Sequence, residues 1–247
     1  MVNETALRDK SRAEIVHDWL QQVDYRVASF QKDRNAIFRL RYRAYLNEGS
    51  ISSNPEKMFT DDYDAMDNCW IFGVFHDDWL ISSIRFHVIR QENRYGPALD
   101  VFPDLVAPMV DAGQTIIDPT RFVVDEEATK MFPDLPFLTL RVATMASEFF
   151  DADHCLATVR AEHRAFYRRV FESKQLCDPR PYPTLTQPIC LMTADVRGIR
   201  DKLMRRYPVF QSSFTERKML MTDFALTAVN GGNSNLPSYV QKASGFS

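Results

Sequence analysis

Apolar and polar positions along this chain repeat with two different periods, which together predict alternating helices and strands. The segment 136–150 has a clear period of 3.6 residues, which is typical of an amphipathic helix. Short apolar runs bounded by turn residues predict buried strands. The expected helices are 4–20, 34–49, 136–150, 161–173 and 195–207, and the expected strands are 25–30, 69–75, 79–90, 115–125, 154–160, 175–183 and 188–196.

Turn and cap residues predict the boundaries between these elements. Asp33 is expected to cap the helix that follows it, and Gly49 to end that helix. The sequence HDD at 76–78 predicts a tight hairpin, and the polar, acidic stretch 50–68 predicts a loop. A short helix is expected within 94–114.

The element order, β-α-β-β-β-α-β-α-β, predicts an α/β fold with a mixed sheet and helices on both faces. A ligand is expected where neighbouring parallel strands splay apart. We divide the chain into an N-terminal helix (1–22), a main domain (23–210) and a C-terminal extension (211–247). The last residues of that extension are small, polar and aperiodic, which predicts a flexible tail.

Composition narrows the class of protein. Hydrophobic residues make up 45% of the chain and charged residues 26%, as in ordinary globular proteins. The N-terminus lacks an apolar signal-peptide core, no apolar run reaches bilayer length, and the four cysteines are scattered. We therefore expect a cytoplasmic protein with reduced thiols and no transmembrane segment. The five histidines form no HxH or HxxxH pair, and the pI is near 6.0, so neither a metal nor a nucleic acid is an expected ligand.

Charge is divided unevenly along the chain. Residues 61–155 hold 18 acidic and 6 basic residues, a balance of −12, whereas residues 156–218 hold 13 basic and 6 acidic residues, a balance of +7. A basic C-terminal half predicts an acidic partner. The alternative is that these charges only solvate helix faces.

Two segments add to the element order: LRYRAY (40–45), in a helix after the first strand, and EHRAFYRRVFE (162–172), which follows a later strand. Together with that order they resemble the GCN5-related N-acyltransferase (GNAT) superfamily over about residues 24–195. The first is similar to the family's first helix and the second to its final segment. The resemblance implies a mixed, mostly antiparallel central sheet. It also implies that Tyr167 protonates the departing thiolate; the alternative is a core aromatic whose hydroxyl bonds to the backbone.

One feature of that superfamily is missing. Members that use coenzyme A have a glycine-containing loop whose amides hold the pyrophosphate at a helix N-terminus. The corresponding segment here, 125–137, has no glycine, four acids and two prolines. Acids repel a pyrophosphate and prolines lack amide donors, so free acetyl-CoA is not the expected donor.

Four spaced motifs follow one another along the chain. They are Arg41 with Tyr45, Asp61 with Tyr63 and Asp64, Arg85, and Asp118 with Thr120, Arg121 and Phe122. In this order they resemble a narrower branch, the acyl-homoserine-lactone (autoinducer) synthases and the related N-acyl amino acid synthases. The homoserine-lactone synthases usually carry a tryptophan in the loop before the acidic motif, and residues 46–60 hold none. That difference favours the N-acyl amino acid synthases.

The resemblance implies roles for these residues. An amine that attacks a thioester must lose a proton, and Asp118 is the expected base. Arg41, Arg85 and Phe122 are expected to bind substrate, with either arginine holding an acceptor carboxylate. Asp61, Asp64 and Arg121 are expected to form a structural ion network.

Asp118 and Arg121 raise a geometric question. Strand alternation places them on opposite faces unless Pro119 bulges the strand. Such an irregularity would also free a strand amide to stabilise the oxyanion of acyl transfer. The alternative is that Asp118 and the arginines simply belong to one structural ion network.

The resemblance implies an acyl thioester donor and no tightly bound cofactor. Acyl carrier protein is an acidic donor that needs no pyrophosphate loop, so we expect acyl-ACP rather than acyl-CoA. Basic side chains of two helices could dock it. They are Arg164, Arg168 and Arg169 on one helix, and Arg200, Arg205 and Arg206 on the other.

These observations predict an N-acyltransferase that moves a long acyl chain from acyl carrier protein to the amino group of an amino acid or similar amine. The helix 136–150 could line the acyl tunnel, although core packing explains its pattern equally well. Two alternatives are a homoserine-lactone synthase that uses S-adenosylmethionine, and a non-catalytic acyl-carrier or lipid-binding module.

Overall fold

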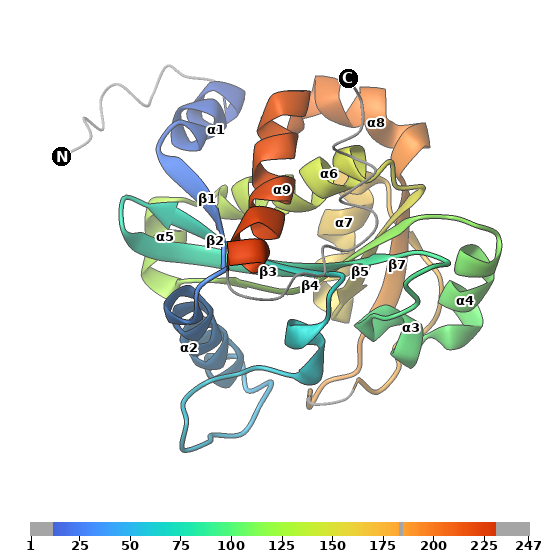
Figure 1. The fold of residues 1–247 in the computed structure, drawn as a ribbon, viewed down its shortest axis with the longest axis horizontal. Helices are drawn as coiled ribbons and strands as arrows, with labels where there is room; N and C mark the ends of the chain where they lie inside the picture. The colour runs from blue at the N-terminus through green and yellow to red at the C-terminus, as the bar shows by residue number, and fades with distance from the viewer. Residues whose placement is uncertain (1–11, 183–184, 231–247) are drawn as a thin grey trace.

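One seven-stranded sheet organises the protein, in the order β1-β2-β3-β4-β5-β7-β6. The computed structural model describes residues 12–182 and 185–230 (Figure 1). The strands are β1 (Val23–Val27), β2 (Cys69–His76), β3 (Trp79–Ile89), β4 (Ile116–Val124), β5 (His154–Val159), β6 (Lys174–Gln175) and β7 (Cys190–Asp195).

The sheet is mixed and mostly antiparallel, as expected. The pairs β1–β2, β2–β3, β3–β4, β5–β7 and β6–β7 are antiparallel, and β4–β5 is parallel. The parallel pair is short, because only Ile116 with His154 and Ile117 with Cys155 are in register. β4 and β5 therefore diverge towards their C-terminal ends.

Helices cover both faces of the sheet (Figure 1). Residues of α1, α6, α7, α8 and α9 pack into one hydrophobic core, whereas α2, α3 and α4 contribute to clusters on the other side. The helices are α1 (Arg12–Leu20), α2 (Gln31–Asn47), α3 (Pro97–Val101), α4 (Pro103–Asp111), α5 (Glu126–Met131), α6 (Leu135–Phe149), α7 (Arg164–Phe171), α8 (Val196–Arg206) and α9 (Phe214–Asn230), with short 3-10 turns η1 (Asp62–Ala65), η2 (Ala161–His163) and η3 (Pro208–Phe210).

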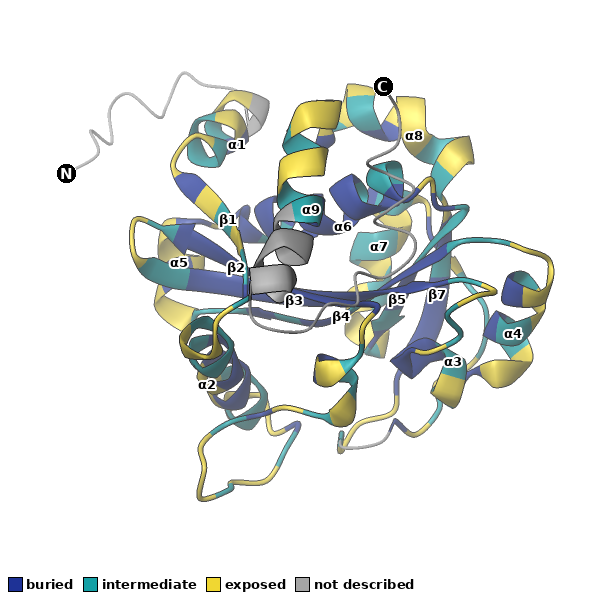
Figure 2. Ribbon diagram, viewed as in Figure 1, coloured by how far each residue is buried: buried dark blue, intermediate teal, exposed yellow. Residues whose placement is uncertain are grey.

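α6 is the central helix of the larger core, and Figure 2 shows it largely buried, behind α9 and on the same side of the sheet as α8. Its 3.6-residue apolar period is carried by Leu138, Val142 and Met145, each fully enclosed. Arg141 is also buried. Its guanidinium is compensated there, because it donates to Glu216 of α9 at 2.7 Å and to the carbonyl of Val209 at 2.7 Å. This pairing fixes the C-terminal helix to the core.

Several expectations about local structure were wrong. Phe30, not Asp33, occupies the cap position of α2, and Asp33 lies in the first turn, where a carboxylate favours the helix dipole. Gly49 does end that helix, with a φ of 65°. Within 175–182, the described part of the expected strand 175–183, only Gln175 belongs to a strand, β6, and Arg180 forms one bridge with Ile189.

Three helices were not expected. Two short helices, α3 and α4, lie within 94–114, where one was expected. α5 forms inside 125–137, where Asp125 caps it by accepting hydrogen bonds from two of its amides. α9 begins at Phe214, inside the stretch assigned to a C-terminal extension. The expected tail at 231–247 and the start of the expected helix 4–20 lie outside the described residues. Within the described ranges, none of the helices combines the length and apolarity that a membrane span needs.

Candidate active site

A cavity of about 830 Å³ opens where β4 and β5 diverge. β4 contributes Pro119 through Val124, and β5 contributes Cys155 through Val159. The remaining walls come mainly from α2, α5, α6, α7 and α8, with a contribution from β7, and are mostly apolar. This volume lies in the range of small-molecule sites, and its position is the one expected for a ligand.

The cavity passes through the sheet. Tyr45 of α2 and Leu140 of α6 both line it, although these helices cover opposite faces. The separation of β4 from β5 leaves the opening between the two sides. A ligand could therefore enter from one face and extend to the other.

A bulge in β4 lies beside this opening. Ser83 pairs with Val123 and Arg85 pairs with Thr120, so Arg121 and Phe122 together stand opposite the single residue between them in β3. Arg121 has a φ of 53°, in the left-handed region. The expected irregularity at Pro119 was wrong, since Pro119 pairs in register with Phe86.

The bulge determines which way Arg121 points. Thr120 and Arg121 both face the side covered by α2 and η1, where Thr120 accepts a hydrogen bond from Arg85 at 3.0 Å and Arg121 donates to Asp61 at 3.2 Å. Phe122 faces the cavity. Asp118 and Arg121 therefore share one side of the strand, as only a bulged strand allows.

Three arginines and two aspartates form a buried ion network beside the cavity. Arg41 binds both carboxylate oxygens of Asp64, at 2.8 and 3.0 Å. Arg85 binds Asp61 and also lies 3.0 Å from Asp64. Arg121 binds Asp61. The structure thus brings together the three residues expected to form a network and adds Arg41 and Arg85.

The turn η1 presents the two aspartates. Asp61 occupies the cap position of that turn, and the side chain of Asp64 accepts hydrogen bonds from the Asp61 amide at 3.1 Å and the Thr60 hydroxyl at 2.9 Å. Burial disfavours the charged carboxylate of Asp64, but Arg41 and Arg85 outweigh burial and hold its pKa below the usual range. Arg85 likewise has a raised pKa because Asp64 and Asp61 outweigh its burial. Asp64 and Arg85 are therefore ionised at neutral pH. The pKa of Arg41 is instead lowered, because burial outweighs the effect of Asp64 there.

The cavity does not reach Arg41 or Arg85. Both side chains are fully buried, both bind carboxylates of the protein, and neither lines the cavity wall. A ligand in the cavity would meet Phe122, which was expected to bind substrate, but neither of these arginines. Their position opposes the expectation that one of them holds an acceptor carboxylate there.

Asp118 is completely buried next to the cavity. Its Oδ2 accepts a hydrogen bond from the amide of Ala98 at 2.9 Å, whereas Oδ1 has no hydrogen-bond partner among the described residues. Burial raises its pKa to about 7, because one amide and the nearby Arg85 compensate only in part. The neighbouring Pro119 lines the cavity and Asp118 does not.

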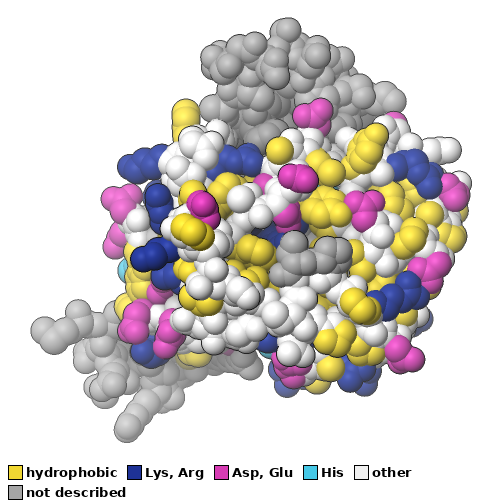
Figure 3. Space-filling view, turned by 90° about the horizontal axis from the view of Figure 1, so that it is seen from below, with side chains coloured by type: hydrophobic (Ala, Val, Ile, Leu, Met, Phe, Trp, Pro, Cys, Tyr) yellow, Lys and Arg dark blue, Asp and Glu magenta, His cyan; other side chains and the backbone are white. Residues whose placement is uncertain are grey.

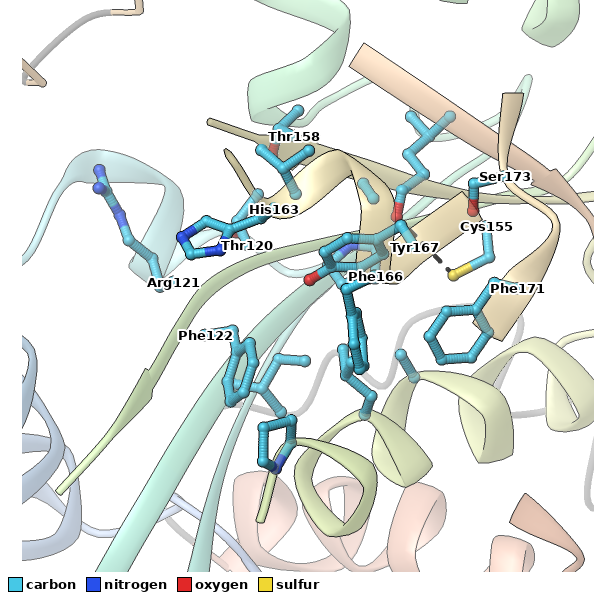
Figure 4. A pocket seen from close by; sticks show the side chains of 18 of the residues that line it. Thr120, Arg121, Phe122, Cys155, Thr158, His163, Phe166, Tyr167, Phe171 and Ser173 are labelled. Atoms are coloured by element: carbon cyan, nitrogen blue, oxygen red, sulfur yellow. Dashed lines mark hydrogen bonds between the residues drawn. The ribbon is translucent and has the colours of Figure 1, made fainter. Parts of the chain in front are cut away.

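Tyr167 of α7 lines the cavity directly. Figure 4 shows its ring reaching from the helix into the space beside β4, with the hydroxyl towards the Thr120–Phe122 segment. Burial raises its pKa above the usual value, and Cys155 and Tyr45 raise it further. The phenol keeps its proton at neutral pH, so it can donate a proton but not act as a base.

Charged residues that the sequence did not single out lie at the cavity mouth. Arg160, at the end of β5, is 3.3 Å from Glu48 of α2 and 3.0 Å from Glu162. His163 lines the same region. Arg160 directly follows an apolar strand, and a polar residue at the C-terminal end of a strand is the signal that could have identified it.

The arginines expected to dock a carrier protein lie on α7 and α8, which contact each other. Arg168, Arg169 and Arg205 are exposed. Arg164 is half-buried and donates to Gln175 at 2.8 Å and to the Ala161 carbonyl at 3.0 Å, so it is partly committed within the protein. On the face formed by α2, η1 and α3, acidic and basic side chains are interspersed (Figure 3).

Comparison with known proteins identifies the family. The family model for the N-acyl amino acid synthase FeeM matches residues 36–195. The structure of FeeM, an N-acyl amino acid synthase from uncultured soil microbes, has a TM-score of 0.61 and 15% identity, covering 74% of this chain and 96% of that chain.

Two homoserine-lactone synthases share the fold. The CoA-dependent synthase BjaI, solved with S-adenosylmethionine and isopentyl-CoA, has a TM-score of 0.54 and 15% identity, covering 78% of this chain and 91% of that one. The synthase LasI has a TM-score of 0.52 and 16% identity, covering 69% and 88%. These similarities confirm the GNAT-like fold. A search of curated proteins finds no match.

Proposed function

Because the chain belongs to the FeeM family of N-acyl amino acid synthases and is an acyltransferase, we propose that it transfers a long acyl chain from acyl carrier protein to the amino group of an amino acid. The observation that carries this proposal is the apolar cavity between β4 and β5, with Tyr167 in its wall and Asp118 behind it. An acyl chain suits the apolar walls, and the polar groups gather where the two strands diverge.

The reaction moves two protons in opposite directions. The amine attacks the thioester carbonyl, so a C–N bond forms and the C–S bond breaks. Asp118 accepts the proton that the amine loses through a chain of waters, since its side chain does not reach the cavity and lies close to the end where β4 and β5 pair. Tyr167 gives its proton to the departing thiolate, and water returns the proton from Asp118 to Tyr167.

The oxyanion needs a hydrogen-bond donor near the reacting carbonyl. The bulge in β4 supports a main-chain donor at Phe122, because this residue has no partner in the β3 register. Phe122 also lines the cavity. The bulge at Arg121 therefore takes the role that the sequence suggested for Pro119.

The acceptor would bind at the cavity mouth. Arg160 and Glu48 lie 3.3 Å apart there and offer one charge of each sign. An α-amino acid also carries one charge of each sign, so Arg160 can hold its carboxylate and Glu48 its ammonium group. The ammonium group first loses one proton to solvent water at the cavity mouth, which gives the neutral amine that attacks. Arg160 takes over the role first expected of Arg41 or Arg85.

Two features favour acyl carrier protein over coenzyme A as the donor. The α5 amides that could hold a pyrophosphate are already occupied, since Asp125 Oδ1 accepts from Glu127 at 3.1 Å and from Ala128 at 3.4 Å. The exposed Arg168, Arg169 and Arg205 fit an acidic carrier protein. All four cysteines are free, which fits the cytoplasm as the proposed location.

The second candidate function is homoserine-lactone synthesis from S-adenosylmethionine, which the structural likeness to BjaI and LasI favours. The missing tryptophan in residues 46–60 opposes it. The non-catalytic acyl-binding alternative is set aside, because the family model that matches the chain is that of an N-acyl amino acid synthase, which is an enzyme.

The test is a product screen. The purified protein is incubated with long-chain acyl carrier protein and a panel of amino acids, their decarboxylated amines and S-adenosylmethionine, and products are found by mass spectrometry. The proposal expects N-acyl amino acids, with little product from the amines that lack a carboxylate. An acyl-homoserine lactone as the main product would instead establish the second candidate.

A further inference from the structure

The cavity has an open end and a closed end. At the open end β4 and β5 have diverged, and at the closed end they pair at Ile117 and Cys155. Cys155 lines the cavity, so the space continues down to the point where the strands meet. A chain bound along the cavity would therefore end near this closed end.

α6 forms one wall along this direction. Pro136, Leu140, Thr144 and Glu148 line the cavity at four-residue intervals, which places them on one face of the helix. Twelve residues separate the first from the last, or about 18 Å along the helix axis. The wall therefore runs from the open end, beside α5, to the C-terminal end of α6.

The wall stays apolar until its last turn. The hydroxyl of Thr144 donates to the Arg141 carbonyl at 2.8 Å, and that of Ser147 donates to the Ala143 carbonyl at 2.8 Å. Both hydroxyls are thus turned back onto the helix. From α8, Ile199 and Leu203 add apolar surface on the facing side.

An ion pair closes this end. Arg200 of α8 binds Glu148 of α6 through Nε, 2.8 Å from each carboxylate oxygen, and through Nη2 at 2.7 Å. The Glu148 side chain is 9% exposed and the Arg200 side chain 54% exposed. Both residues line the cavity, so the pair stands between the apolar space and solvent.

We propose that the Arg200–Glu148 pair is an end wall that limits the length of the acyl chain this enzyme accepts, a proposal that rests on the acyltransferase function stated above. A chain that reaches the pair must either stop or displace Arg200 and leave a nearly buried carboxylate without its partner. Because Arg200 is half exposed, its removal opens a path between α6 and α8 to solvent. Chain length is then no longer limited at this point.

The test compares straight-chain acyl thioesters from octanoyl to octadecanoyl in the wild type, R200A and E148A. In the wild type, kcat/KM should rise about fourfold with each added methylene that fits, and then fall at a limiting length. In both variants the fall should move to longer chains. The ratio of long-chain to short-chain rates is compared within each variant, which cancels any effect of Arg200 on docking of a carrier protein.

R197A is the matched control. Arg197 lies one turn before Arg200 on α8, is exposed and binds Asp151 at 3.0 Å, but does not line the cavity. Its length profile should match the wild type. Thermal unfolding of each variant shows whether a change in the dependence of kcat/KM on chain length reflects an unfolded protein. If R200A is unstable, E148A tests the same ion pair.

A parallel binding measurement separates this proposal from the proposed function. Free fatty acids of the same lengths are titrated calorimetrically into each folded protein. If the longest fatty acid that binds is longer in R200A than in the wild type, and no amine is acylated, the end wall is supported and the proposed function is contradicted. Transfer with the same length limit in the wild type, R200A, E148A and R197A would overturn the end wall and leave the proposed function standing.

Discussion

Asp118 and His87 lie directly opposite each other in the β3–β4 register, and both are completely buried. Each keeps one polar atom, Oδ1 and Nδ1, without a hydrogen-bond partner among the described residues. Burial lowers the pKa of His87 to about 3, helped by Arg85, while burial raises that of Asp118 to about 7. A neutral imidazole therefore faces a carboxyl group that can gain or lose a proton near neutral pH.

The first prediction concerns the stability cost of Asp118. Its pKa in the folded state, about 7, lies above the ordinary value of 3.8. Folding therefore favours the protonated carboxyl group. Its contribution to the free energy of unfolding is fully present below about pH 4 and is lost as pH rises through 7, which lowers that free energy by about 4 kcal/mol. D118N should remove this loss between pH 4 and pH 8, measured by urea unfolding.

The same substitution should reduce activity. If Asp118 is the base, kcat/KM of the wild type should rise with pH through about 7. D118N should lower kcat on the order of 10²-fold or more and remove that rise. A variant that is both more stable at pH 8 and fully active would show that Asp118 is structural.

The second prediction concerns Tyr167. Y167F should lower kcat on the order of 10²-fold, because the departing thiolate loses its proton donor. The loss should be smaller with a thioester whose thiol is more acidic, since that thiolate needs no proton to leave. Y207F is the control, because Tyr207 packs in the same core next to Phe137 but does not line the cavity; an equal loss in both variants would point to packing.

The third prediction concerns the ion network. D64N leaves Arg41 and Arg85, both fully buried, with reduced compensation and should lower the free energy of unfolding by about 3–5 kcal/mol. Because the pKa of Asp64 is held low, its stabilisation is present above about pH 4 and is lost as pH falls below that value. The exposed pair of Arg180 and Asp104 gives the comparison: D104N should change the free energy of unfolding far less than D64N, because solvent screens this pair.

The fourth prediction concerns the carrier protein. Charge reversal in R168E/R169E should raise KM for acyl carrier protein roughly tenfold and weaken the dependence of the rate on salt. The rate with a small pantetheine thioester should not change, because these side chains lie outside the cavity. R26E, on β1 at the far edge of the sheet, is the control. A uniform loss with both donors would place the effect in the fold instead.

The sequence predicted the architecture well where local pattern determines the element. The hairpin 76–78, the helix that became α6, and the parallel β4–β5 pair with its ligand space were all expected and are present. The ion network was also predictable in outline, because charged residues in otherwise apolar strands need partners of opposite sign.

Register and distant packing could not be read from the sequence. The bulge lies at Arg121 rather than Pro119, because its position depends on how β3 pairs with β4. Arg41 and Arg85 point into the network, not the cavity, because η1 brings Asp61 and Asp64 to them. α5 could have been found, since Asp125 followed by two glutamates is a helix-start signal.

The most direct test of this account is the initial rate of amide formation with equal concentrations of long-chain acyl carrier protein and of acetyl-CoA, using one amino acid acceptor. We expect rapid N-acylation from the long-chain carrier protein and little from acetyl-CoA, because the cavity is apolar and the α5 amides are occupied by Asp125. Turnover of acetyl-CoA with no transfer from the long-chain carrier protein would contradict it.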